Sequence, residues 1–192
     1  DLIESKGEEL ATLETLDGGK LLSGVRNGEI PSAAESFRYY AGWCTKMEGR
    51  TPQISIPGMK FHAYTQREPI GVVAQIVPWN GPLVMAAWKL APALAAGCTC
   101  ILKPAEQTPM STLLLGELFE QAGIPSGVVN IVTGDGKTGT ALVEHPGVDK
   151  IAFTGSSATA RKILVEASGN LKKVSLELGG KSPVIVFADA DL

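Results

Sequence analysis

The feature that most constrains the fold is a regular alternation that begins at Ile70 of the 192-residue chain. Short, nearly continuous apolar runs such as GVVAQIVPW (71–79) alternate with helix-length segments such as LVMAAWKLAPALAAG (83–97). A run that is apolar at almost every position is typical of a strand buried on both faces of a parallel sheet. Because strand and helix alternate with right-handed crossovers, the sequence predicts an α/β fold with a doubly wound, mostly parallel sheet.

The same alternation predicts the remaining elements of the sheet and its helices. Further strands are expected at 99–104, 127–134, 150–156, 174–178 and 183–187. Further helices are expected at 111–123, 138–145 and 158–169, and Pro92 is expected to bend the helix at 83–97. Residues 70–192 are therefore expected to form one domain of this type.

The first third of the chain has a different character. Residues 1–52 are predicted to be a helical segment, in which Ser32 and Glu35 form a capping box and Gly49 and Pro52 end the helix. Residues 53–69 contain two short extended runs around a Pro-Gly turn, which predicts a hairpin arm that reaches towards a partner subunit.

Composition excludes several classes of partner. A net charge of −3 and an isoelectric point near 5.5 give no basic surface for nucleic acid. No apolar run reaches the roughly 18 residues that a membrane helix needs, so no membrane partner is expected. Three cysteines do not form a disulfide framework, which favours a reducing, cytoplasmic location.

Ligands of doubly wound sheets bind at the carboxyl ends of the strands. Four predicted strand ends carry polar residues without an evident structural role: 78–80, 103–106, 155–156 and 177–180. This coincidence predicts a binding site along that edge of the sheet.

At the third of these strand ends, FTGSSATARK (153–162) predicts a strand, a glycine turn and a helix that begins near Ser156. Free amides at such a helix start suit a pyrophosphate. Alternatively, Ser156 or Ser157 only caps the helix. The stretch is not a G-x-G-x-x-G fingerprint, because Ala160 stands where a third glycine is sought.

The other strand ends also leave alternatives open. Glu106 could accept from both hydroxyls of an adenosine ribose and repel a 2′-phosphate, or it could form an exposed ion pair with Lys103. The Asn80 amide could donate to a developing oxyanion, or Asn80 could simply be a turn residue before Gly81.

Glu177 stands between two leucines and before two glycines, which predicts partial burial and a raised pKa, as a general base requires. The alternative is a carboxylate turned to solvent. Lys89 lies in an otherwise apolar helix and could be a buried relay or a snorkelling side chain. Cys98 and Cys100 share a strand face, and no second Cys or His cluster completes a metal site with them.

Together, the segments EPIGVVAQIVPWNGPLVMAAWKLAPALAAGCTCILKPAEQTP (68–109), FTGS (153–156) and LELGGKSP (176–183) resemble the NAD(P)-dependent aldehyde dehydrogenases. The resemblance covers roughly 32–192 and is dense from Glu68 onward. It implies that 70–192 is a Rossmann-like, NAD-binding domain that is incomplete at its C-terminal end. In such enzymes a cysteine thiolate attacks the aldehyde, a hydride passes to the cofactor, and water hydrolyses the resulting thioester.

The resemblance implies a role for each candidate residue. Glu177 would be the base that activates the hydrolytic water, Asn80 the oxyanion donor and Lys89 a proton relay. Lys103 and Glu106 would hold the adenosine ribose, so that NAD is favoured over NADP. The implied cofactor-binding residues are Ile76, Val77, Pro78, Trp79, Asn80, Lys103, Pro104, Ala105, Glu106, Gly136, Gly155, Ser156, Leu178 and Gly179.

The resemblance also implies what is missing. The family's nucleophile lies in an N-x-G-Q-x-C stretch downstream of the glutamate, and Cys44, Cys98 and Cys100 do not lie in that motif. We therefore expect the chain to be part of a longer enzyme, without the catalytic domain and inactive alone. At full length it would be a homo-oligomer, either dimer or tetramer. Gly81 departs from the family, in which many members carry an aromatic residue at this position, and would leave room for a bulkier or aromatic aldehyde. FRYYAGWCTKMEG (37–49) resembles the branch that oxidises arylacetaldehydes such as phenylacetaldehyde.

Two other functions are compatible with the residues alone. The chain could be a naturally short, non-catalytic protein that binds nucleotides or a partner subunit. A reductase built on a free-standing nucleotide fold is disfavoured, because no G-x-G-x-x-G follows the first strand.

Overall fold

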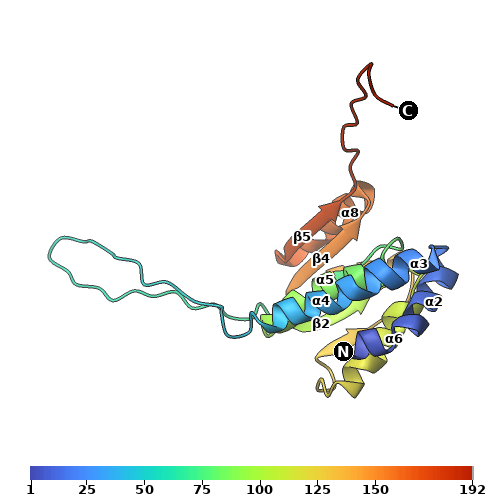
Figure 1. The fold of residues 1–192 in the computed structure, drawn as a ribbon. Helices are drawn as coiled ribbons and strands as arrows, with labels where there is room; N and C mark the ends of the chain where they lie inside the picture. The colour runs from blue at the N-terminus through green and yellow to red at the C-terminus, as the bar shows by residue number, and fades with distance from the viewer. Residues whose placement is uncertain (192) are drawn as a thin grey trace.

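The computed structural model describes residues 1–191 and contains a five-stranded sheet in the order β3-β2-β1-β4-β5 (Figure 1). All four strand pairings are parallel. The strands are β1 (Val72–Ile76), β2 (Thr99–Lys103), β3 (Val129–Ile131), β4 (Lys150–Gly155) and β5 (Lys173–Leu178). The predicted α/β fold with a parallel sheet is confirmed.

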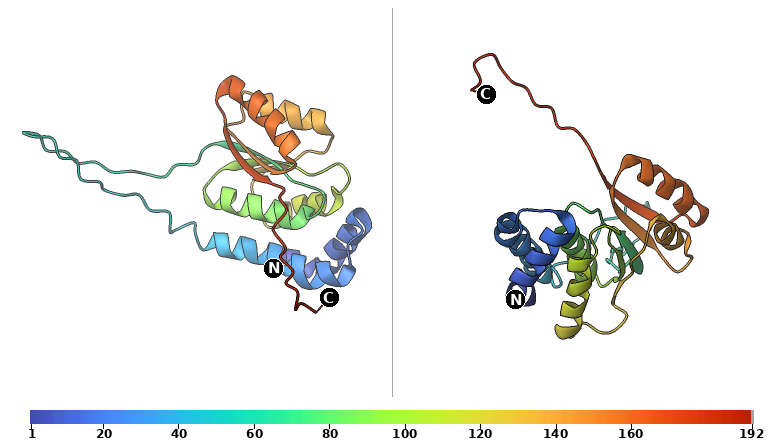
Figure 2. Two further views of the ribbon diagram at one scale, coloured as in Figure 1. Left: turned by 90° about the horizontal axis from the view of Figure 1, so that it is seen from above. Right: turned by 90° about the vertical axis from the view of Figure 1, so that its right-hand side faces the viewer.

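Helices cover both faces of the sheet, as a doubly wound fold requires. The crossover helices are α5 (Pro82–Ala95), α6 (Met110–Gln121), α7 (Gly136–Glu144) and α8 (Ser157–Ala167), and a short 3-10 turn, η2 (Ser168–Asn170), follows α8. Cys100 and Leu102 of β2 belong to the core under α5 and α6, whereas Ile101 packs against the core under α7 and α8. Figure 2 shows α5 and α8 on opposite sides of the strands.

The N-terminal helices form a further layer outside α5 and α6. They are α1 (Leu2–Ser5), α2 (Gly7–Gly18), α3 (Leu22–Gly24), the π-helix η1 (Val25–Glu29) and α4 (Ile30–Ala41). Leu10 of α2 and Ile30 of α4 are buried in the same core as Leu83 and Leu90 of α5. This layer therefore buries the outer side of the helices that follow β1 and β2.

The predicted capping box at Ser32 is wrong. The chain is already helical from Val25, and α4 continues directly from η1, so Ser32 lies inside the helix. Its carbonyl accepts a hydrogen bond from the Ser36 hydroxyl at 2.9 Å. The helix also ends at Ala41, well before the predicted Gly49 and Pro52, because the residues that follow are exposed and have no layer to pack against.

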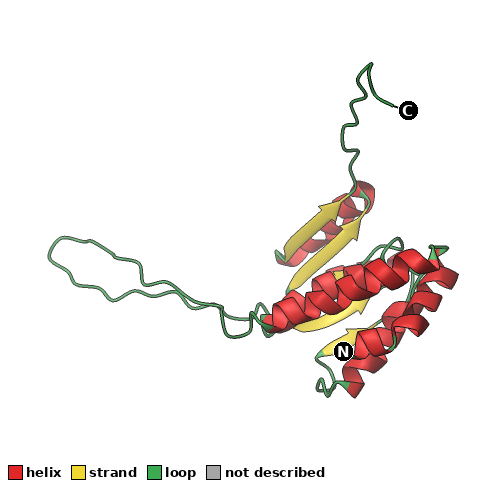
Figure 3. Cartoon of the chain, viewed as in Figure 1, coloured by secondary structure: helices red, strands yellow, loops and turns green. Residues whose placement is uncertain are grey.

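Residues 46–70 form a long arm that leaves the body of the molecule as two extended segments (Figure 3). The predicted Pro57-Gly58 turn is present, with Gly58 at φ 79° and a single bridge between Ile56 and Met59. Lower in the arm, the Thr65 amide donates to the Arg50 carbonyl at 2.7 Å. The extended runs are therefore present without the regular ladder of a β-hairpin.

The strand predicted at 183–187 is also wrong. After Leu178 the chain runs away from the sheet (Figure 1), and Val184 and Phe187 are 86% and 72% exposed. A strand needs a neighbouring strand to pair its amides and carbonyls, and these residues lie beside none. Within residues 1–191, no helix has both the length and the apolar character needed to cross a membrane.

Candidate functional site

A cleft of about 880 Å³ lies at the carboxyl ends of β1, β2 and β4, as expected for a doubly wound sheet. It gathers side chains from the loops after these strands and from helices α7 and α8. The predicted residues that line it are Ile76, Val77, Pro78, Trp79, Lys103, Ala105, Glu106, Gly136, Gly155 and Ser156. Three of the four predicted strand ends therefore meet in one cavity.

Ser156 starts α8 and lines this cleft. Its hydroxyl oxygen accepts from the Thr159 amide at 3.2 Å, so Ser156, not Ser157, is the N-cap of the helix. The amides of Ser157 and Ala158 belong to the first turn, where backbone donors have no intrahelical partner. Capping and anion binding are therefore compatible here, because the cap uses only one of the available donors.

Gly155 precedes this cap and needs to be a glycine. A Cβ atom at this position would lie 2.5 Å from Cζ of Phe153, closer than packed atoms approach. The Phe153 ring therefore packs directly against the backbone of the turn. This contact leaves the chain at the helix start without a side chain that would screen the amides of α8.

Lys103 and Glu106 differ sharply in exposure. Lys103 is 4% exposed, whereas the Glu106 side chain is 52% exposed. The Lys103 ammonium donates to the Pro104 carbonyl at 3.0 Å and lies 4.0 Å from Oε2 of Glu106. Burial lowers the pKa of Lys103, and the Glu106 and Asp135 carboxylates oppose that effect. The alternative of an exposed surface pair is therefore wrong for Lys103, while Glu106 presents its carboxylate at the rim of the cleft.

Asn80 lies in the turn between β1 and α5 and is exposed. It follows Trp79, which lines the cleft, but Asn80 itself lies outside the lining. Asn80 is therefore a turn residue, as the alternative interpretation predicted, and this turn lies next to the cavity. Pro104 is buried and contributes its carbonyl to Lys103.

Glu177 pairs in register with Thr154 of β4, and Leu178 pairs with Gly155. Thr154 and Gly155 both line the cleft, so the end of β5 lies directly beside it. Glu177 is exposed, and the predicted partial burial is wrong. Helix α5 packs on β1 and β2, and within residues 1–191 no layer covers the same face of β5. Leu178 and Gly179 are likewise exposed at the end of this strand.

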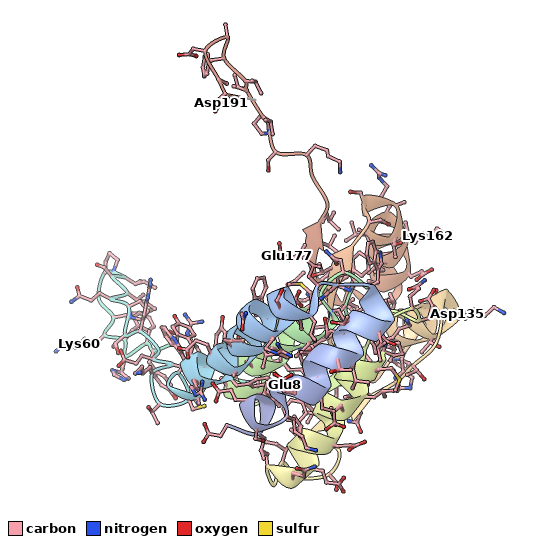
Figure 4. The ribbon with its side chains drawn as sticks, turned by 45° about the vertical axis from the view of Figure 1, so that its right-hand side comes forward. Glu8, Lys60, Asp135, Lys162, Glu177 and Asp191 are labelled. Atoms are coloured by element: carbon pink, nitrogen blue, oxygen red, sulfur yellow. The ribbon has the colours of Figure 1, made fainter. Side chains whose placement is uncertain are left out.

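Lys89 on α5 lies on the same side of the sheet as Glu177. Burial lowers the pKa of Lys89, the Glu177 carboxylate counteracts this, and the Lys150 ammonium adds to it. Figure 4 shows Glu177 on the side of β5 that faces away from α8, the helix that carries Lys162. The predicted base and the predicted relay therefore lie on the same side of the sheet, opposite the side on which α8 packs.

Several residues that line the cleft were missed by the sequence analysis. They are Gln107, Asp135, Lys137, Gly139, Thr140, Ala141, Glu144, Phe153, Thr154, Thr159, Lys162, Ile163 and Glu166. Asp135 caps α7 by accepting from the Lys137 amide at 2.9 Å. An aspartate just before a helix start is a recognisable signal, so Asp135 could have been predicted together with its neighbour Gly136. Lys162 and Glu166 lie further along α8, where the sequence carries no comparable signal.

The cysteines lie apart from this arrangement. Cys98 and Cys100 are buried and Cys44 is exposed, and all three are free. Burial raises the pKa of the Cys100 thiol to about 12, with a further contribution from Cys98, so it is not activated as a nucleophile. Among residues 1–191, no cluster of three or more His, Cys, Asp and Glu side chains is placed to hold a metal ion.

Comparison with known proteins gives a consistent result. The aldehyde dehydrogenase family model matches residues 1–192. Phenylacetaldehyde dehydrogenase of Pseudomonas fluorescens is 55% identical over all of this chain and 39% of its own length. Human retinal dehydrogenase 2 is 53% identical over all of this chain and 37% of its own length. The NAD+ complex of aldehyde dehydrogenase from Bacillus cereus superposes with a TM-score of 0.94 at 53% identity, over all of this chain and 38% of that one.

Proposed function

Because this chain belongs to the aldehyde dehydrogenase family, we propose that the cleft at the ends of β1, β2 and β4 binds NAD. The observation that supports this best is the meeting of a capped helix start and an exposed carboxylate in one cavity. Ser156 and the first turn of α8 suit the pyrophosphate. Glu106 suits the hydroxyls of the adenosine ribose, and Gly155 leaves space for a close approach.

The same carboxylate sets the preference between cofactors. A 2′-phosphate at the ribose would bring its charge next to Glu106, whose carboxylate lies 4.0 Å from the ammonium of the largely buried Lys103. The negative charges of the phosphate and the carboxylate would repel each other, so binding of NAD is favoured over binding of NADP. The cofactor, when bound, supplies the hydride acceptor for aldehyde oxidation.

We propose that the full-length protein oxidises an aldehyde to its carboxylic acid, with residues of this chain in three roles. Asn80 donates its amide to the oxyanion that forms on the substrate. Glu177 removes a proton from the water that hydrolyses the acyl group, and Lys89, on the same side of the sheet, holds or passes on that proton. We propose that the attacking thiolate comes from outside residues 1–192. Cys98 and Cys100 are buried, and neither they nor Cys44 lie in an N-x-G-Q-x-C stretch.

The substrate is proposed to be an aromatic aldehyde, such as an arylacetaldehyde. A hollow of about 510 Å³ between α4 and α5 is lined by three aromatic side chains, Tyr39, Tyr40 and Trp88, and by three polar ones, Ser32, Glu35 and Ser36. Trp88 directly precedes Lys89 in α5, and this adjacency supports the choice of the hollow as the substrate site. At Gly81 a Cβ atom would meet only the Met85 side chain, at 3.8 Å, so the position leaves room for a bulky substrate.

We also propose that the full-length protein is a cytoplasmic homo-oligomer. The arm at 46–70 exposes Ile54, Phe61 and Tyr64, which favours a homo-oligomer, dimer or tetramer, in which a second copy covers it. Three free cysteines favour a cytoplasmic location. The net charge of −3 supports a small-molecule substrate over nucleic acid or an anionic membrane surface.

The proposal is tested by calorimetric titration of the full-length protein with NAD and NADP, followed by turnover of phenylacetaldehyde measured as NADH absorbance. We expect NAD to bind more tightly than NADP and to be reduced only when aldehyde is present. A protein that binds neither dinucleotide at millimolar concentration would contradict the assignment of the cleft. Binding without turnover by any aldehyde would instead support a non-catalytic nucleotide-binding role.

A further inference from the structure

The most deeply buried carboxylate of the described chain belongs to Glu14 on α2, far in sequence from every predicted site residue. Its side chain is 0% exposed. Its Oε1 accepts from the Leu83 amide at 3.0 Å and from the Ser111 hydroxyl at 2.5 Å. Its Oε2 accepts from the Lys20 ammonium at 2.6 Å, and Lys20 also contacts Glu29 at 2.6 Å. Both oxygens are therefore satisfied, as a buried charge requires.

The two partners of Oε1 lie at the starts of different helices. Leu83 is the second residue of α5, and Ser111 is the second residue of α6. Neither helix has a side-chain cap of its own, since their N-cap residues are Gly81 and Pro109. A carboxylate is the preferred acceptor for the free amides and positive dipole end of a helix. Glu14 thus caps α5 from a third helix and ties the first turn of α6 to it.

A second carboxylate on α2 reinforces this arrangement one turn away. Oδ2 of Asp17 accepts from the Met110 amide, the first residue of α6, at 2.8 Å. The two loops are also joined directly, because the Thr108 hydroxyl donates to the Trp79 carbonyl at 3.2 Å. Helix α2 therefore fixes where α5 and α6 begin relative to each other.

The loops just before these helix starts carry the proposed cofactor contacts. The loop from Pro78 to Gly81 leads into α5 and places Trp79 in the cleft and Asn80 beside it. The loop from Pro104 to Pro109 leads into α6 and places Glu106 at the rim. We infer that Glu14 is a positioning residue for the site, which sets the spacing between the Trp79–Asn80 loop and the Glu106 loop without touching any ligand. The inference rests on the proposed NAD site for its functional consequence.

Two variants of Glu14 in the full-length protein separate positioning from general stability. Glu14→Gln keeps an oxygen acceptor for both helix starts but places an amide beside the Lys20 ammonium. Glu14→Met has a similar volume and removes both acceptors. Glu29→Gln is the matched control, because it removes the other carboxylate on Lys20 and touches neither helix start.

The first measurement is amide hydrogen exchange without cofactor. We expect faster exchange at residues 79–84 and 108–112 together, stronger in Glu14→Met than in Glu14→Gln, while α7 and α8 exchange as in the unmodified protein. Glu29→Gln is expected to leave both loops unchanged. Exchange that accelerates uniformly through the chain, or in only one of the two loops, would overturn the inference.

The second measurement is NAD binding at a temperature where every variant is fully folded. We expect the Kd for NAD to rise about tenfold in Glu14→Met, as for loss of hydrogen bonds to a charged group, and less in Glu14→Gln. Unchanged affinity together with a lower Tm would show that Glu14 is merely structural. If the unmodified protein does not bind NAD, the proposed function fails, while the exchange pattern still decides whether Glu14 couples the loops.

Discussion

Glu177 of β5 is the register partner of Thr154 of β4, and Thr154 lines the cleft. In a parallel pair, residues in register point to the same face of the sheet. The face in question is the one that α5 partly covers, and Lys89 reaches it from that helix. The proposed base therefore lies at the boundary between the cleft and the exposed face of β4 and β5.

Replacing Glu177 by Gln in the full-length protein is expected to slow steady-state turnover by about a hundredfold or more, because a general base is lost. Hydride transfer precedes this step. Rapid formation of NADH in the first turnover should therefore remain visible in stopped-flow absorbance. Glu117→Gln on the exposed face of α6 is the control. Undiminished steady-state turnover in Glu177→Gln would remove the assignment of the base.

Replacing Glu106 by Gln is expected to weaken NAD binding by about tenfold, since hydrogen bonds to a charged acceptor become bonds to a neutral one. NADP binding should improve in the same variant, because the repulsion of a 2′-phosphate disappears. Both changes are read from calorimetric titrations, with Glu120→Gln, an exposed carboxylate on α6, as the control. A variant with the same ratio of NAD to NADP affinity as the unmodified protein would show that Glu106 does not contact the ribose.

Ser156→Ala removes the cap of α8 and should destabilise the protein by about 1 kcal/mol. It should also raise the Kd for NAD, because the first turn of α8 loses its fixed start. Ser157→Ala is the matched control, since this neighbouring hydroxyl does not cap the helix. Equal effects of the two substitutions on Tm and on NAD affinity would contradict the role given to Ser156.

The lowered pKa of Lys103 gives a prediction on the pH dependence of stability. Below the lowered pKa the lysine is charged in both folded and unfolded states, and folding bears the cost of burying the charge. As the pH rises towards the ordinary value of 10.5, the folded chain releases the proton first, and this cost disappears. The Tm of the unmodified protein, relative to that of Lys103→Met, should therefore increase from neutral to alkaline pH.

That comparison is made without cofactor, so that binding does not contribute. Lys60→Met, on the exposed arm, serves as the control and should show a constant difference in Tm across the same pH range. A constant difference for Lys103→Met as well would mean that burial of Lys103 does not influence folding.

The alternation of apolar runs and helices was sufficient to predict the sheet and its crossover helices, because each buried strand carries its own local pattern. The prediction of a strand at 183–187 was wrong because it relied on the local pattern alone. The apolar run is typical of a strand, but pairing depends on a neighbouring strand that the local sequence does not reveal. The exposure of Glu177 depends likewise on which layer covers β5. At Ser32 a correct local signal was overridden, because the preceding residues were already helical.

The residues of the candidate site were likewise predictable only in part. Residues directly after strands, such as Glu106 and Ser156, were found because the carboxyl ends of parallel strands must meet at one edge. Lys162 and Glu166 reach the cleft from within a helix, and nothing in their local sequence distinguishes them from surface residues. The role of Glu14 could not be predicted from local sequence. Its partners lie on two other helices, and only the packing of α2 brings them together.

The sheet order places β1 in the middle, between β2 and β4. One crossover helix leads from β1 to β2, whereas β4 follows only after β2, α6, β3 and α7. During synthesis from the N-terminus, helices α2, α4, α5 and α6 can therefore close over β1, β2 and β3 while one edge of β1 still lacks its neighbour. Until residues 150–155 leave the ribosome, this edge of β1 stays unpaired and can mispair with another strand.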